Sequence, residues 1–81
     1  MLPESIQTAC RTLNSTSVGE LSREALVAFS SLSAFHHHFP SRCTDEISDL
    51  IEKFSYLRER EPSRYLKQRR IALARIFARS L

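Results

Sequence analysis

The chain has few of the residues that make turns or cross-link small folds. Its 81 residues contain one Gly, three Pro and two Cys. So few turn formers argue against a turn-rich β fold and against a flexible linker protein. Apolar residues make up 42% of the chain, which is too many for intrinsic disorder. The length is enough for a single domain, residues 1–81, but not for two.

Long apolar runs and targeting signals are also lacking. The longest uninterrupted apolar stretch covers residues 25–29, far short of a bilayer span. The N-terminus has neither a basic start nor an apolar run, so no signal peptide is recognised. We therefore expect a soluble, cytoplasmic protein. In that compartment Cys10 and Cys43 are expected to be buried free thiols, with a disulfide between them as the alternative.

Apolar residues recur at helical spacing in four segments, and the first two lie before Pro40. The first segment, residues 3–13, is short, and residues 14–16 form the turn that follows it. Its apolar side is expected to contain Ile6, Ala9, Cys10 and Leu13. The second is expected to run over residues 17–39, because Ser17 and Glu20 have the spacing of a capping box. It should end there because the residue before a proline disfavours helical geometry.

The other two segments follow Pro40. The third is expected to start at a cap provided by Thr44 or Asp45 and to end at residue 61, before Pro62. The fourth is a basic C-terminal helix, residues 62–81. Since no segment alternates like a strand, the prediction is an all-α fold: a small helical bundle of one short N-terminal and three longer helices.

The apolar stripes of these helices define the expected core. On the second helix, seven residues fall within about 120° of arc, the width of a core-facing stripe: Leu21, Ala25, Ala28, Phe29, Leu32, Phe35 and Phe39. Leu26, Val27 and Ala34 lie off this stripe. A chain this small buries only about 60% of the surface its unfolded form exposes, so extra burial is needed. We therefore expect a homodimer and assign these three residues to self-association.

The third helix has two contrasting sides. Its apolar stripe is expected to contain Ile47, Leu50, Ile51, Phe54 and Leu57. Opposite this stripe lies an acidic row made of Asp45, Asp49, Glu52 and Glu59.

Charge is divided unevenly along the chain. Residues 62–81 contain six of the twelve cations and none of the nine carboxylates, a net charge of +6. Residues 1–61 contain the other six cations and all nine acids, a net charge of −3. Such asymmetry is typical of a basic element presented to an anionic partner. A solvated helix face is the simpler alternative, but such a face usually mixes both signs.

The candidate partner-binding residues are therefore cations of the last helix: Arg64, Lys67, Arg69, Arg75 and Arg79. Arg69 differs from the others because it falls within the apolar stripe that contains Tyr65, Leu66, Leu73, Ile76 and Phe77. A charge there must extend to solvent, pair with a carboxylate or face a partner. Pairing with Glu52 or Glu59 is the simpler interpretation. In the alternative interpretation the stripe is an interface, since Arg and aromatic anchors are typical of binding hot spots.

The pattern does not indicate an enzyme or a bound cofactor. His36, His37 and His38 are adjacent, and adjacent helical residues project about 100° apart, so they cannot converge on one ion. No sequence feature supports a nucleophilic set around Cys10 or Cys43. The prediction is a small non-enzymatic interaction or regulatory protein, an adaptor or inhibitor, that docks its basic helix on an acidic protein surface. The alternative is a nucleic-acid-binding regulator using the same Arg row on phosphates, and membrane binding ranks third.

Overall fold

The computed structural model describes the backbone of residues 2–80 and the side chains of residues 2–78. The helices are α1 (Glu4–Asn14), α2 (Arg23–His38), the 3₁₀ helix η1 (Pro40–Arg42), α3 (Asp45–Lys53), α4 (Tyr56–Arg60) and α5 (Pro62–Ser80). No strand occurs in this described part of the chain, and the all-α prediction is confirmed. The predicted number of helices agrees only roughly, because one predicted helix is two, α3 and α4.

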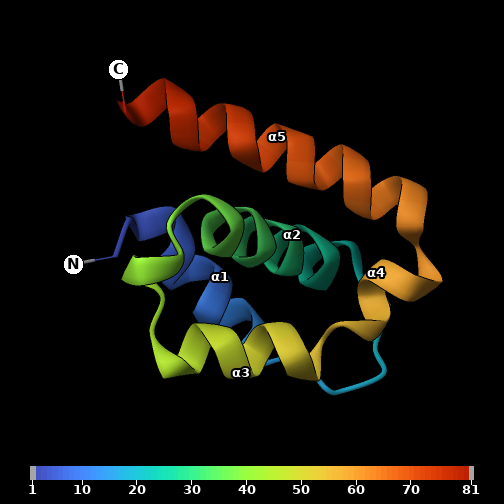
Figure 1. Ribbon diagram of the computed structural model, residues 1–81. Helices are drawn as coiled ribbons and strands as arrows, with labels where there is room; N and C mark the ends of the chain where they lie inside the picture. The colour runs from blue at the N-terminus through green and yellow to red at the C-terminus, as the bar shows by residue number, and fades with distance from the viewer. Residues whose placement is uncertain (1, 81) are drawn as a thin grey trace.

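The helices form three layers, with α2 in the middle. Figure 1 shows α5 on one side of α2, and α1 and α3 on the other side. The chain direction reverses from α1 to α2, from α2 to α3, and again at α4, so α2 and α5 run in the same direction. The rings of Phe29 and Tyr65 lie 5.6 Å apart between their centroids, which ties α5 to α2.

The central position of α2 corrects the prediction for Leu26, Val27 and Ala34. Leu26 and Ala34 are buried in the protein, with 4% and 0% of their surface exposed, and Val27 is half-buried. Because α2 contacts α5 on one side and α1 and α3 on the other, its buried arc is wider than a single stripe. Leu26 and Ala34 therefore belong to the interior, and this surface is not available for self-association. Homodimer formation itself stays a prediction.

The start of α2 also differs from the prediction. The helix begins at Arg23, and the Ser22 hydroxyl accepts a hydrogen bond from the backbone N–H of Ala25 at 3.1 Å. The predicted start at Ser17 is wrong because Gly19 has a φ of 98°, a left-handed conformation that a helix cannot contain. Leu21 then lies in the loop and is exposed.

The predicted third helix is interrupted at Ser55. The Thr44 cap is confirmed, since its hydroxyl accepts from the Ile47 N–H at 3.3 Å. After Phe54, backbone bonds link residues three apart, including Leu57 N–H to the Phe54 carbonyl at 3.0 Å, and this tightened turn separates α3 from α4. Phe54 and Leu57 are both buried, so the apolar stripe continues across the turn.

The short first helix matches its predicted apolar side. Its four stripe residues, Ile6, Ala9, Cys10 and Leu13, are all buried. The side-chain amide of Asn14 donates to a Glu46 carboxylate oxygen at 2.9 Å, which links the end of α1 to α3. The loop before α2 is held in a similar way, because the Tyr56 hydroxyl donates to the Glu20 carbonyl at 3.0 Å.

Candidate partner-binding surface on the terminal helix

Helix α5 rests on α2 through a narrow buried side. Of its described side chains only Tyr65 and Ala72 are buried, while Leu73 and Ile76 are half-buried. The Tyr65 hydroxyl lies 2.7 Å from the Ser33 hydroxyl of α2. The predicted apolar face is therefore only partly correct, because Ala72, which was not assigned to it, is buried, whereas Leu73 and Ile76 are only half-buried.

Two large apolar residues of the predicted face lie at the surface instead. Leu66 is 57% exposed and Phe77 is 49% exposed. Leu66, Arg70, Leu73 and Phe77 are spaced at four, seven and eleven residues, so they project along one flank of α5. We call these four residues the docking stripe. Arg70 is exposed, and the sequence interpretation did not assign it to the site, although its spacing from Phe77 was a usable signal.

The other predicted cations are spread around the helix rather than aligned in one row. Arg64 is exposed, and its guanidinium lies 3.6 Å from the Glu61 carboxylate, a surface pair that contributes little to stability. Lys67 is exposed on the solvent side of α5. The side chain of Arg79 lies outside the described residues.

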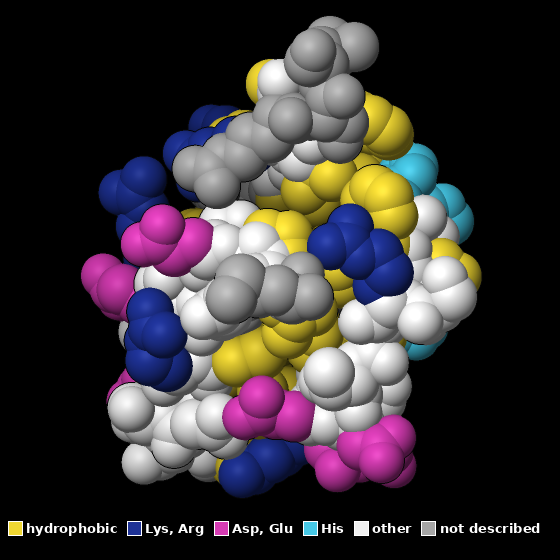
Figure 2. Space-filling model, turned by 90° about the vertical axis from the view of Figure 1, so that its left-hand side faces the viewer, with side chains coloured by type: hydrophobic (Ala, Val, Ile, Leu, Met, Phe, Trp, Pro, Cys, Tyr) yellow, Lys and Arg dark blue, Asp and Glu magenta, His cyan; other side chains and the backbone are white. Residues whose placement is uncertain are grey.

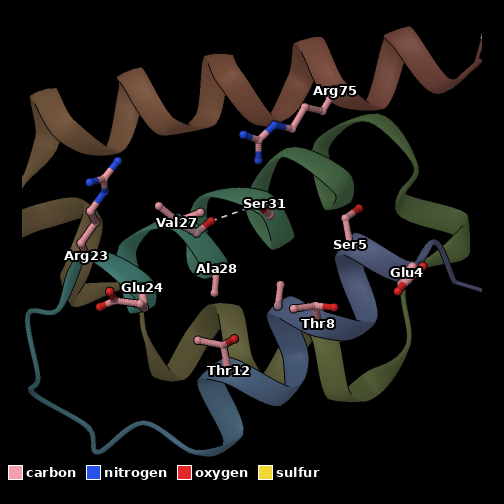
Figure 3. A pocket seen from close by; sticks show the side chains of 11 residues that line it. Glu4, Ser5, Thr8, Thr12, Arg23, Glu24, Val27, Ala28, Ser31 and Arg75 are labelled. Atoms are coloured by element: carbon pink, nitrogen blue, oxygen red, sulfur yellow. Dashed lines mark hydrogen bonds between the residues drawn. The ribbon is translucent and has the colours of Figure 1, made fainter.

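Arg75 overhangs a groove between α5, α1 and α2. Figure 3 shows its side chain projecting from α5 toward α2 near Ser31, while Arg23 stands at the other end of the groove. The groove has a volume of about 640 Å³ and a lining of mostly small side chains, with Glu4 and Glu24 at its edge. Arg75 thus occupies a surface of mixed charge, separate from the docking stripe.

Within residues 2–78, Arg69 does not form the ion pair with Glu52 or Glu59 that the simpler interpretation expected, so the expected pairing is wrong. It is half-buried and lines a second pocket together with residues of α2 and α4. Its position beside Leu66 agrees instead with the interpretation of this flank as a surface for contacts.

A third hollow opens at the end of the molecule where α5 finishes. Figure 2 shows hydrophobic side chains at the surface of this end. The pocket has a volume of about 600 Å³, and Phe35, Phe39 and Ile76 contribute its apolar lining. The Arg42 guanidinium lies 5.4 Å from the centroids of both Phe rings, a distance typical of cation–π contacts. One side of the hollow is therefore formed by the Phe35 and Phe39 rings, with the Arg42 guanidinium placed over them.

The three adjacent histidines lie at the end of α2, where the His37 and His38 rings meet edge-on at 4.9 Å between centroids. The His38 ring meets the Phe77 ring edge-on at 5.0 Å between centroids, which places the end of α2 beside the docking stripe. His36 and His37 line the same pocket as Arg69. Among residues 2–78, no three His, Cys, Asp or Glu side chains are grouped closely enough to hold a metal ion.

The two cysteines are free thiols with little nucleophilic character. Burial, assisted by the negative charge of Glu46, raises the pKa of the Cys10 thiol above its usual value. Burial also raises the pKa of the Cys43 thiol, which donates to the Phe39 carbonyl at 3.6 Å. A raised pKa keeps both thiols protonated near neutral pH, whereas a catalytic cysteine needs the thiolate.

None of the helices in the described part of the chain combines the length and apolar character needed to cross a bilayer. Comparison of the chain with protein-family models, with curated proteins and with solved structures found no match.

Proposed function

We propose that this is a small non-enzymatic interaction protein that binds an acidic surface of a partner protein through α5. The observation that carries the proposal is the docking stripe, in which exposed Leu66 and Phe77 lie on the same flank as Arg70. Apolar anchors next to Arg are typical of binding hot spots. A carboxylate-rich partner helix or loop would match both the apolar residues and the cations of this flank.

The charge of α5 supports an acidic partner in particular. Its sequence contains six cations and no carboxylate, so no acid within the helix offsets them. Arg also suits interfaces, because its planar group pairs with carboxylates in bidentate geometry and is weakly hydrated. The mixed-charge groove beside Arg75 offers no comparable selectivity for acidic groups.

A nucleic-acid-binding function remains the second candidate, and one structural observation favours it. The acidic residues Asp45, Asp49 and Glu52 lie on α3, and α2 separates α3 from α5 (Figure 1). A polyanion lying along α5 would therefore not meet these carboxylates. Phosphate backbones, however, provide no apolar surface to cover Leu66 and Phe77, and for this reason we place protein binding first.

The test compares two single variants of the docking stripe with a matched control. Arg70→Glu changes an exposed side chain and should alter the free energy of unfolding by no more than about 0.5 kcal/mol. Phe77→Ser removes a half-covered ring that contacts His38 and should cost about 1 kcal/mol, so unfolding of this variant is measured together with binding. The control, Arg11→Glu, makes the same charge change at an exposed residue of α1. A partner identified by affinity capture with the native protein is then purified, and its dissociation constant is measured against each variant by calorimetry.

We expect Arg70→Glu to weaken partner binding by about 2–5 kcal/mol, because repulsion replaces attraction at an acidic surface. Phe77→Ser should weaken it as well, and Arg11→Glu should not. Equal affinities for all variants would exclude the docking stripe. Titration with a random DNA duplex tests the second candidate, since phosphate contacts give a linear loss of log affinity with log salt.

A further inference from the structure

A pocket on the α4 side of the molecule collects hydrogen-bond donors from several helices. It has a volume of about 400 Å³ and lies where residues of α2, α3, α4 and α5 meet. Its polar lining residues are Ser33, His36, His37, Arg58, Tyr65 and Arg69. No Asp or Glu lines it, although the chain contains nine of them. A lining of this kind favours an anion.

The two arginines supply fixed positive charge from separate helices. Arg58 comes from α4 and Arg69 from α5, and no ion pair to a carboxylate holds either one within residues 2–78. Both arginines line the same pocket, so an anion bound there would offset the repulsion between two like charges. A phosphoryl group fits this need, because its oxygens can accept paired N–H bonds from each planar guanidinium.

The uncharged groups add donors at a defined position. The Ser33 and Tyr65 hydroxyl oxygens are 2.7 Å apart, so one O–H donates to the other and the second O–H is free to donate elsewhere. Each imidazole offers at least one N–H in either protonation state. The lining residues His36 and His37 therefore bring further potential donors to the pocket from α2.

The size of the pocket and its apolar residues indicate more than a bare phosphate ion. A volume of about 400 Å³ falls within the range of small-molecule pockets. Ile51 and Leu66 complete the lining and offer apolar contact to an organic group. We propose that this pocket binds a small phosphate monoester, with the phosphoryl group between Arg58 and Arg69. The proposal goes beyond partner docking and does not depend on it.

The test uses the full chain labelled with ¹⁵N and three probes: inorganic phosphate, glucose 6-phosphate and adenosine 5′-monophosphate. Amide shifts are followed at constant ionic strength, with sodium chloride as the reference. We expect saturable shifts at Ser33, His36 and His37, with tighter binding of at least one monoester than of inorganic phosphate. Equal affinity for inorganic phosphate and for both monoesters would assign the site to the free ion and overturn the proposed monoester.

Two double variants distinguish binding in this pocket from attraction of the probe to the net positive charge of the protein. Arg58→Gln with Arg69→Gln removes both guanidinium groups, and each loss should weaken binding about tenfold, as for a charge-assisted hydrogen bond. Arg11→Gln with Arg60→Gln removes the same charge from exposed residues outside the pocket and should change affinity less than about twofold. The spectrum of each apo variant verifies its fold. An equal loss in both double variants, or no saturable shift for any probe, would overturn the proposal.

Discussion

The hydroxyl of Ser30 gives the sharpest test of how α5 packs on α2. Ser30 is completely buried, and its hydroxyl has no hydrogen-bond partner among the described residues. Ser33, three residues along the same side of α2, contacts Tyr65 of α5, so Ser30 belongs to the packed interior of α2. Replacing Ser30 with Ala should stabilise the protein, because it removes a polar group that folding dehydrates without compensation.

The expected magnitude follows from three contributions. An unsatisfied buried polar group costs about 1–3 kcal/mol, and this penalty is removed. Ala also favours an α-helix over Ser by about 0.5 kcal/mol. The small void left by the missing oxygen subtracts about 0.5 kcal/mol. The net gain is about 1–3 kcal/mol in the free energy of unfolding, and each kcal/mol raises the Tm of a domain of this size by roughly 4–8 °C.

The assay is urea and thermal unfolding of Ser30→Ala, with Ser31→Ala as the matched control. Ser31 is half-buried, and its hydroxyl donates to the Val27 carbonyl at 3.0 Å, so its removal relieves no unsatisfied group. The control should therefore change the free energy of unfolding by less than about 0.5 kcal/mol. A Ser30→Ala variant less stable than the native protein would show that this hydroxyl is satisfied, and the reasoning would fail.

Three further predictions concern single residues of the core. Leu26→Ala should lower the free energy of unfolding by about 2–5 kcal/mol in urea titrations, because Leu26 is buried in the protein. An unchanged stability would show that Leu26 is not part of the core. Tyr65→Phe should cost about 1 kcal/mol by losing the Ser33 contact, and a thermal melt identical to that of the native protein would contradict this. Alkylation of Cys10 by iodoacetamide should be slow at neutral pH and accelerate as the pH rises toward the raised pKa of this thiol; a rate equal to that of the urea-unfolded chain would contradict the effect of burial.

Local signals allowed much of the fold to be predicted. The period of Ile6, Ala9, Cys10 and Leu13 identifies the buried side of α1 without reference to any other helix. Thr44 is a cap for a local reason, since its hydroxyl satisfies an N–H only three residues away. The start of α2 was predicted wrongly because Ser17 and Glu20 have the spacing of a capping box. Gly19 adopts a backbone conformation that excludes a helix there, and Ser22 is the cap instead.

Two other differences depend on tertiary packing that a helical period does not contain. Leu26 and Ala34 looked like a spare surface because the stripe analysis assigns one buried side to each helix, whereas α2 is covered on two sides. The turn at Ser55 has no signal in the apolar pattern of the sequence. Phe54 and Leu57 are three residues apart and share a buried face whether or not the helix is interrupted between them. The pocket containing Arg58 and Arg69 is assembled from four helices, and no spacing within one segment predicts it.

The layer order also determines how charge is arranged in the folded protein. α3 carries four acids and one Lys, whereas α5 carries six cations and no acid. Because α2 lies between these helices, the two groups of charge occupy opposite sides of the molecule (Figure 1). Their mutual attraction is weakened by distance and by salt. Apart from Arg64, which lies 3.6 Å from the Glu61 carboxylate, no cation of α5 forms an ion pair among the side chains of residues 2–78. The charge of Arg70 is therefore available to the acidic partner that we propose, and that of Arg69 to the monoester beside it.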